Sequence, residues 1–342
     1  MINRKSLKNS LRFLEKLNYS RIVNFLLLLY SYYWSKYSKK AIQKGLPVSI
    51  SIEPTTSCNL RCPECPSGLR SFTRPTGMLE EKLFQKVVNE MAPHLLYLNL
   101  YFQGEPFLHP QFTQFIKYAS SKKIYTSTST NAHYLNDENC RKTIESGLDR
   151  LIVSIDGITQ ETYQSYRVGG SLEKVIEGTK NIINWKNKLK SSSPHLVFQF
   201  LVVKPNEHQV EEVKLLAEEL GVDEVVLKTA QIYNYQSGSD LIPDNQNYSR
   251  YRLNKDGSWT IKNSLDNHCW KMWHSSVITW DGKVVPCCFD KDASHPMGSV
   301  KEKTFQEIWK GEKYLQFRKA ILRSRSEIEI CKNCSEGTKV WA

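Results

Sequence analysis

The 342-residue sequence has no low-complexity tract, no short internal repeat and no apolar run long enough to cross a lipid bilayer. The missing repeats exclude a solenoid. A composition of 40% hydrophobic and 24% charged residues excludes a disordered chain. The longest nearly apolar stretch, residues 22–34, would span about 20 Å as a helix, which is shorter than the ~30 Å hydrocarbon core. No small-residue cleavage site follows this stretch, so we expect no secretory signal.

The excess of basic residues is confined to an amino-terminal arm, residues 1–47. Before Pro47, ten Lys or Arg residues stand against one acid, Glu15, so nine of the twelve net positive charges fall in this arm. The rest of the chain is nearly balanced and offers no basic groove. Nucleic acid is therefore not an expected partner.

The arm also has a helical pattern. Its leucines at positions 7, 11, 14 and 17 recur at helical spacing, and its apolar stretch ends in aromatic residues that Lys36, Lys39 and Lys40 follow. This order is typical of a helix that lies on an anionic membrane surface. The alternative is a helix that packs its apolar face on the barrel or on a second subunit, and the sequence leaves both open.

From residue 48 to about 232, short β-branched and aromatic segments alternate with helix-period segments. This alternation predicts parallel strands with right-handed crossovers. Six units are too few for a closed eightfold barrel, so we expect an α/β fold with an open, partial (β/α)6 TIM-like barrel over residues 48–235. The ligand site should lie at the carboxyl ends of the strands. The predicted strands are 48–53, 97–103, 124–130, 150–155, 196–203 and 224–229, and the predicted helices are 79–91, 111–121, 137–146, 172–188 and 207–220.

A polar link after residue 232 leads to a second, smaller unit, residues 254–342. Gly282 in Trp280-Asp281-Gly282-Lys283 predicts a hairpin turn between strands at 276–279 and 284–285. Residues 305–323 have the pattern of one amphipathic helix.

Three cysteines follow the first predicted strand directly. Cys58, Cys62 and Cys65 are spaced by four and three residues, and three thiolates at this spacing can hold one cubane iron–sulfur cluster. The fourth iron then has no protein ligand and is open to a small molecule with amino and carboxylate groups. A zinc site is the alternative, but zinc typically takes four protein ligands and no histidine lies nearby.

This Cys-x-x-x-Cys-x-x-Cys motif resembles that of the radical S-adenosylmethionine (SAM) superfamily, and the resemblance covers residues 48–232. Gly104 and Glu105 are similar to the end of the family's Gly-Gly-Glu motif, which holds the methionine amino group of SAM, although Gln103 replaces the first glycine. Pro63 also departs from the family, which often has an aromatic residue there. Singly, the matching strand-end residues could be turn or cap residues. The resemblance implies that further strand-end residues contact SAM, namely Thr130, Asn131, Ser154, Asp156 and Arg167.

Four cysteines near the end of the chain resemble the family's auxiliary-cluster domain, called SPASM or, when shortened, twitch. They are Cys269, Cys287, Cys331 and Cys334. The resemblance implies a second, fully ligated [4Fe-4S] cluster, with structural zinc as the alternative. Cys288 is the weak candidate for a catalytic residue, as a proton or hydrogen donor, although packing is the default interpretation for it and for Cys140.

The resemblance implies an enzyme that uses a [4Fe-4S] cluster with an open iron to cleave SAM to a 5′-deoxyadenosyl radical, which then abstracts a hydrogen atom from a substrate. An auxiliary cluster that accepts an electron favours oxidation or rearrangement of a small or lipid-linked substrate. The alternative is a peptide- or protein-modifying maturase. An alternative of another class is a non-catalytic iron–sulfur electron-transfer or membrane-docked protein.

The resemblance also implies an external electron donor such as flavodoxin or ferredoxin. Nine cysteines, an odd number that falls mostly into two clusters with ligand-like spacing, fit a reducing compartment better than a disulfide framework. We therefore expect a cytoplasmic protein, and a peripheral one on the inner face of the membrane if the arm binds lipid.

Overall fold

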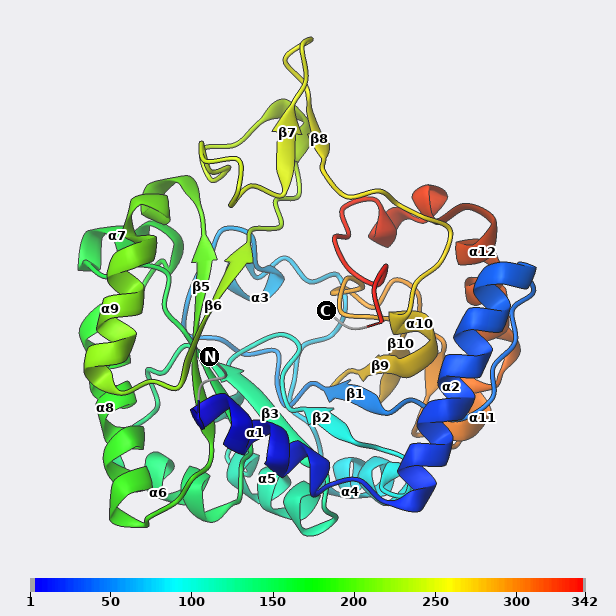
Figure 1. Cartoon of the computed structure of the whole chain (residues 1–342), viewed down its shortest axis with the longest axis horizontal. Helices are drawn as coiled ribbons and strands as arrows, with labels where there is room; N and C mark the ends of the chain where they lie inside the picture. Colours follow the sequence, from blue (N-terminus) through cyan, green and yellow to red (C-terminus); the bar gives the residue numbers. More distant parts are fainter. Residues whose placement is uncertain (1–3, 341–342) are drawn as a thin grey trace.

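The structure is a computed structural model that describes residues 4–340. Its centre is a curved nine-stranded sheet in the order β11-β10-β9-β1-β2-β3-β4-β5-β6, with a separate β7-β8 pair (Figure 1). Strands β1 to β6 pair in parallel with their neighbours, as expected for an open, partial barrel. Their bounds are β1 Ser49–Ile52, β2 Tyr97–Asn99, β3 Tyr125–Thr130, β4 Arg150–Ser154, β5 His195–Val202 and β6 Glu224–Thr229.

Helices that connect these strands cover the outer face of the sheet (Figure 1). Each turns an apolar stripe inward, as α4 (Glu81–Met91) does with Phe84, Val87 and Met91. The five predicted helices are thereby confirmed, with shifts of a few residues at their ends. The other four are α5 Phe112–Ser121, α6 Asp137–Glu145, α8 Leu172–Lys188 and α9 Val210–Leu220, and two short helices, α3 Pro66–Leu69 and α7 Gln160–Tyr166, lie in loops at the carboxyl ends of the strands.

The carboxyl-terminal part continues the barrel sheet. The predicted hairpin is present as β9 (Ser275–Ile278) and β10 (Lys283–Val285), and β11 (Gly298–Ser299) follows at the edge. Strand β9 pairs in parallel with β1, a long-range contact that the sequence did not indicate. Because one sheet runs through both parts of the chain, the predicted boundary between them stays a prediction.

Two expectations for this part need correction. The single helix predicted at 305–323 is wrong: the chain forms α11 (Phe305–Trp309) and α12 (Glu312–Ser324), separated at Gly311. Gly311 has extended backbone at the start of α12, so the first helix cannot continue through it. An unpredicted hairpin, β7 (Tyr251–Leu253) and β8 (Trp259–Ile261), runs from the end of the polar link into the predicted second unit and projects at the top of Figure 1.

The amino-terminal arm forms two helices, α1 (Arg4–Leu14) and α2 (Tyr19–Ser38), and Asn18 caps the second. Tyr32 of α2 packs edge-on against Trp270 and Trp273, beside and within the short helix α10 (Lys271–His274). One side of α2 therefore packs on the protein, but it is not the apolar face, since Leu26, Tyr30 and Trp34 are exposed. Packing of the apolar face on the barrel is thus wrong, whereas a membrane surface and a second subunit stay open. No helix within residues 4–340 is long and apolar enough to cross a membrane.

Candidate active site

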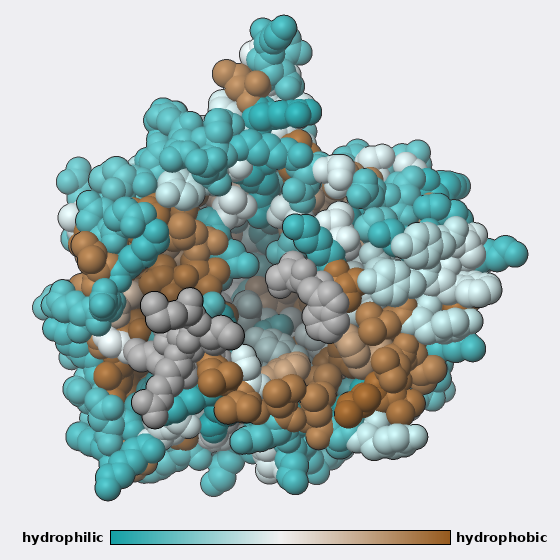
Figure 2. Space-filling model, in the orientation of Figure 1, coloured by the Kyte–Doolittle hydropathy of each residue, from teal (hydrophilic) through white to brown (hydrophobic). Residues whose placement is uncertain are grey.

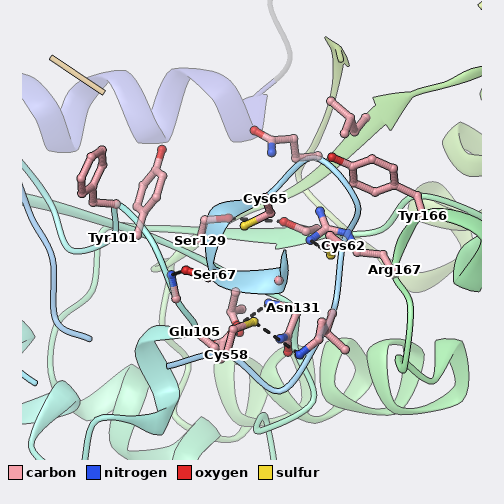
Figure 3. Close-up of a pocket in the computed structure, with 18 residues that line it drawn as sticks. Cys58, Cys62, Cys65, Ser67, Tyr101, Glu105, Ser129, Asn131, Tyr166 and Arg167 are labelled. Atoms are coloured by element: carbon pink, nitrogen blue, oxygen red, sulfur yellow. Dashed lines mark hydrogen bonds between the residues drawn. The ribbon is translucent and has the colours of Figure 1, made fainter. Parts of the chain in front are cut away.

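A cavity of about 180 Å3 opens at the carboxyl ends of the parallel strands. The cysteine loop after β1 forms one wall, and the residues after β2, β3 and β4 form others (Figure 3). The lining brings together most of the residues that the sequence singled out: Cys58, Cys62, Cys65, Gly104, Glu105, Thr130, Asn131, Ser154 and Arg167. Parallel strands place their carboxyl ends at one edge of a sheet, which is why residues 100 positions apart meet here.

The cysteine loop is folded tightly enough to direct three thiols to one side. A Cβ at Gly68 would lie 2.5 Å from the Cys62 backbone nitrogen, so only glycine allows α3 to pack this closely on the loop. Burial raises the pKa of the Cys58 thiol to about 11, and burial also raises that of Cys62, where Arg167 opposes the shift. The thiols therefore hold their protons until iron displaces them.

Glu105 is buried at the floor of the cavity and is held on both carboxylate oxygens. Its Oε1 accepts a hydrogen bond from the Thr130 hydroxyl at 2.7 Å, and its Oε2 accepts one from the Asn131 backbone N–H at 2.8 Å. Burial outweighs these bonds and raises the pKa of Glu105 to about 6. A cationic partner such as an ammonium group would stabilise the charged form of this desolvated carboxylate.

Gly104 has a left-handed backbone, φ +75°, that places strand β2 against the cysteine loop. A Cβ at this position would lie 2.3 Å from the Thr55 carbonyl oxygen. The Gly104 N–H donates to the Ser67 hydroxyl at 2.9 Å, and the Glu105 N–H donates to the Ser57 carbonyl at 2.8 Å. The close approach therefore requires glycine.

Arg167 supplies the positive charge on the other side of the cavity. Its Nε donates to the Asp156 carboxylate at 2.5 Å, and its Nη1 lies 3.9 Å from the Cys62 sulfur. Asp156 is fully buried, does not line the cavity, and also accepts the Leu201 backbone N–H at 2.7 Å. The structure thus places Asp156 behind Arg167, where it orients the guanidinium.

Several lining residues were missed by sequence reasoning. Tyr101 and Phe102 follow β2, Tyr166 precedes Arg167, and Gln199 and Leu201 alternate on β5. The period-2 pattern of β5 could have indicated the last two, since both point to the same face. The predicted second strand ends at Asn99 rather than at residue 103, so Tyr101 and Phe102 lie in the loop after β2, and Tyr166 ends α7. Nothing in the sequence marked these aromatic side chains for the cavity, which Pro63 does not line.

The four carboxyl-terminal cysteines also gather. Burial is the main cause, and the charge of the neighbouring Cys269 the second, that raise the pKa of Cys331 to about 12. Cys334 accepts from the Arg325 guanidinium at 3.2 Å and from the Glu336 backbone N–H at 3.3 Å. The charges that raise the pKa of Cys287 include those of Cys269 and Cys334.

The backbone beside this second set passes so close to a cysteine sulfur that it leaves no room for a side chain. Gly337 has φ +84°, and a Cβ there would lie 2.4 Å from the Cys269 sulfur. The Arg325 side chain is buried and supplies positive charge next to Cys334. Buried thiols in an electropositive cradle with only glycine alongside fit an iron–sulfur cluster, which carries negative charge.

Cys288 does not pack in the core, which corrects the default interpretation. It is exposed, with the Lys271 ammonium 3.8 Å from its sulfur, and Lys271 also pairs with Glu336. Cys140, by contrast, is fully buried in α6, as expected. Burial raises the pKa of Tyr101, which lines the first cavity, and the charges that also act on it include Cys288 and Lys271.

Neither set of thiols is arranged around the position of a single metal ion. Within residues 4–340 no three Cys, His, Asp or Glu side chains are arranged to hold one metal ion. A cubane cluster holds its thiolates farther apart than one ion does, so convergence of three thiols on one cavity wall is the arrangement that a cluster needs.

Comparisons with known proteins agree with this geometry. The model of the radical SAM superfamily matches residues 52–213, and that of an iron–sulfur cluster-binding domain, SPASM, matches residues 269–335. The tungsten-containing aldehyde ferredoxin oxidoreductase cofactor-modifying protein of Pyrococcus furiosus is 24% identical over 311 residues, which cover 83% of this chain and 86% of the relative.

Two solved structures share the fold. BtrN in complex with AdoMet and 2-DOIA has a TM-score of 0.52 at 18% identity, over 86% of this chain and 95% of BtrN. Streptococcus suis SuiB bound to precursor peptide SuiA has a TM-score of 0.62 at 14% identity, over 88% of this chain and 73% of SuiB.

Proposed function

Since the chain belongs to the radical SAM superfamily of enzymes, we propose that it binds SAM in the cavity beside Cys58, Cys62 and Cys65 and oxidises or rearranges a small or lipid-linked substrate. The matched domains imply a [4Fe-4S] cluster with SAM at the first loop and an auxiliary iron–sulfur cluster near the carboxyl terminus. When bound, the reduced cluster and SAM supply a 5′-deoxyadenosyl radical that removes a hydrogen atom from the substrate.

The observation that carries the proposal is the pair of opposite charges in the cavity of the three thiols. Glu105 and Arg167 both line it. The methionine part of SAM has one ammonium and one carboxylate, and Glu105 can accept from the first while Arg167 donates to the second. Thr130 and the Asn131 backbone fix the acid, and Asp156 fixes the arginine. These residues orient SAM before any chemistry begins.

The second cysteine set favours an oxidation. Removal of a hydrogen atom turns the substrate into a radical. This radical must still lose one proton and one electron to become a stable product, which is oxidised by two electrons overall. The auxiliary cluster would accept that electron, and Tyr101, which lines the first cavity, is within electrostatic reach of Cys288, the neighbour of Cys287. The exposed Cys288, beside Lys271, is the candidate for a catalytic residue that donates a proton or a hydrogen atom.

A peptide substrate is the second candidate. SuiB, whose fold this chain shares, was solved with a precursor peptide bound. The open partial barrel would admit an extended chain as well as a compact metabolite. The two candidates differ in size rather than in the chemistry of the first steps.

For partners, we propose an external electron donor such as flavodoxin or ferredoxin, because reduction of a cluster needs an electron that this chain does not generate. We also propose a cytoplasmic protein that meets the inner face of a membrane through the arm, residues 1–47, where nine net positive charges gather.

The test uses reconstituted holoprotein with SAM and dithionite. We expect release of 5′-deoxyadenosine, which Cys58→Ser abolishes and Cys140→Ala preserves. Cell extract is then separated into polar metabolites, lipids and peptides, and each fraction is added. Stimulation by the metabolite or lipid fraction supports the first candidate, and stimulation by peptides alone supports the second. No 5′-deoxyadenosine with both clusters present would leave only the non-catalytic electron-transfer or membrane-docked protein.

A further inference from the structure

Helix α2 turns its polar residues toward the protein. The residues it buries, at spacings of three or four positions, include Arg21, Asn24, Ser31 and Ser35. The Asn24 side chain exchanges two hydrogen bonds with the Leu46 backbone, at 2.7 and 2.8 Å, and the Lys44 N–H donates to Ser31 at 2.8 Å. Arg21 is 2% exposed and donates to backbone carbonyls, among them Ala92 at the end of α4. The inner face is thus held to the protein by hydrogen bonds.

The outer face of the same helix is apolar. Its exposed residues also recur every three or four positions, and they lie opposite the buried set. They are Ile22, Val23, Leu26, Leu27, Tyr30, Tyr33, Trp34 and Tyr37. A surface helix of a water-soluble protein has the reverse arrangement, with apolar residues inward. Helix α2 is therefore amphipathic with its polar face buried and its apolar face exposed.

Helix α1 follows the same rule. Its inner side carries Arg12, 3.7 Å from the Asp149 carboxylate, and Asn9, which accepts from the Tyr125 hydroxyl at 2.5 Å. Lys16, just after the helix, lies 3.4 Å from the same carboxylate. Its outer side carries Leu7, Leu11 and Leu14, each at least half exposed. We call these leucines, together with Tyr19 at the start of α2 and the other exposed apolar residues of that helix, the arm face.

The arm face holds most of the exposed apolar side chains in the described part of the chain. Of nineteen large hydrophobic residues that are exposed, twelve belong to it. Figure 2 shows hydrophobic residues gathered over α1 and the lower half of α2, continuing into paler residues along the upper half. An apolar surface this concentrated marks an interaction site rather than the scattered exposure of a monomer surface.

Charge selects between partners for this face. The aromatic residues of α2 are flanked by lysines: Lys36 lies over the Tyr37 ring at 5.9 Å and Lys44 over the Tyr30 ring at 5.2 Å. Lys39 and Lys40 follow directly and are exposed. Apolar side chains beneath a rim of aromatics and lysines match the acyl boundary and headgroups of an anionic bilayer. A second copy of the same face would bring almost no acidic groups to these lysines, because Glu15 is the only acid of the arm.

We propose that the arm face docks the protein on an anionic membrane surface, with α1 and α2 lying in the interface and neither crossing the bilayer. This deepens the membrane contact offered above by assigning its residues, and it does not depend on the catalytic proposal. Helix α1 contacts Tyr125 at the start of β3 and Asp149 just before β4, whereas the cysteine cavity opens at the opposite ends of the strands. Docking and SAM cleavage are therefore separable.

The test measures co-sedimentation of the full-length holoprotein with vesicles of phosphatidylcholine alone or with phosphatidylglycerol added. We expect binding to the anionic vesicles that falls at high salt. Leu26→Glu should weaken it by about tenfold or more. Leu253→Glu is the matched control, because Leu26 and Leu253 are both 57% exposed but Leu253 lies on β7. Lys39→Gln with Lys40→Gln should also weaken binding by about tenfold, whereas Lys301→Gln with Lys303→Gln should not.

Release of 5′-deoxyadenosine and the melting temperature show that each variant is folded, and both should match the unaltered protein. Equal vesicle binding by the Leu26 and Leu253 variants would overturn the proposal. So would a dimer in sedimentation velocity that Leu26→Glu converts to a monomer without any vesicle binding by the unaltered chain, because the arm face would then be a self-association surface.

Discussion

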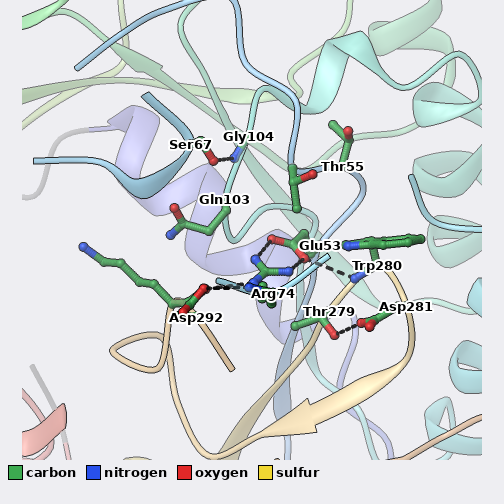
Figure 4. Close-up of polar contacts among 12 residues, drawn as sticks. Glu53, Thr55, Ser67, Arg74, Gln103, Gly104, Thr279, Trp280, Asp281 and Asp292 are labelled. Atoms are coloured by element: carbon green, nitrogen blue, oxygen red, sulfur yellow. Dashed lines mark hydrogen bonds and ion pairs between the residues drawn. The ribbon is translucent and has the colours of Figure 1, made fainter. Parts of the chain in front are cut away.

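Arg74 and Glu53 form a buried, two-armed ion pair that links the first cysteine loop to the carboxyl-terminal part of the chain (Figure 4). The two guanidinium nitrogens lie 2.8 and 2.6 Å from the two carboxylate oxygens. Glu53 directly follows β1 and also accepts the Trp280 N–H, and Arg74 donates to the Lys291 carbonyl at 3.0 Å. The pair therefore joins three segments that approach one another from distant parts of the sequence.

Arg74→Met should destabilise the protein by about 3–5 kcal/mol, because it leaves the Glu53 charge buried without a partner. Adding Glu53→Gln should recover part of the loss. The measurement is the free energy of unfolding in urea for both variants. Arg141→Met is the control, since its pair with Glu145 is nearly half exposed and should contribute less than about 0.5 kcal/mol. An equal effect of the two Arg→Met changes would contradict the role given to the buried pair.

Gly104→Ala should both destabilise the fold and weaken SAM binding. The new Cβ would lie 2.3 Å from the Thr55 carbonyl, so the cysteine loop and the end of β2 must separate. We expect a loss of more than about 2 kcal/mol in unfolding free energy and a rise in the Kd for SAM. Gly169→Ala isolates the backbone cost, because Gly169 also has positive φ, +81°, but nothing within 4 Å of its Cβ. That control should lose about 1 kcal/mol.

The barrel and its site could be read from the sequence because their signals are local. Alternating strand and helix patterns gave all six parallel strands, and the residues that follow β1, β2, β3 and β4 were brought to one cavity as expected. The role of Asp156 could not be read in the same way. Whether a strand-end carboxylate faces a ligand or supports Arg167 depends on packing behind the sheet.

Long-range pairing explains the other gaps. Nothing local in the segment of β9 indicates that it pairs with β1, more than 220 positions earlier. The arm has the same difficulty: its periodicity predicted helices, but only the structure shows that Asn24 and Ser31 face inward. Sequence amphipathicity defines two faces and leaves open which of them is buried.

The Kd for SAM should rise as the pH falls through about 6. Burial raises the pKa of Glu105 to that value, and only the carboxylate attracts the SAM ammonium. The expected Kd at pH 5.5 is about fourfold higher than at pH 7.5. Glu105→Gln should bind SAM more weakly and show no change over this range, and a parallel pH dependence in that variant would assign the effect to another group.

The same shift has a consequence for stability. Folded Glu105 holds its proton more tightly than it does in the unfolded chain, so its contribution to the SAM-free fold is present below the unfolded pKa and is lost as the pH rises through about 6. As the pH rises from 5.5 to 7.5, ionisation of Glu105 should therefore lower the stability of the SAM-free protein, although the same pH change strengthens SAM binding. The measurement compares urea midpoints of the unaltered protein and Glu105→Gln at pH 5.5 and 7.5.

Cys331→Ser separates the two cysteine sets. The buried Cys331 and Cys334 would lose their cluster while the first loop stays intact, because no hydrogen bond of the Cys58 loop reaches them within the described residues. We expect about half of the iron to be lost, 5′-deoxyadenosine to be released as before, and oxidation of the substrate to stop. Cys58→Ser should instead remove both cleavage and oxidation. Metal analysis of the unaltered protein decides between the two chemistries of the second set, since one zinc per chain that Cys331→Ser removes, with unchanged iron, would replace the auxiliary cluster by a structural zinc site.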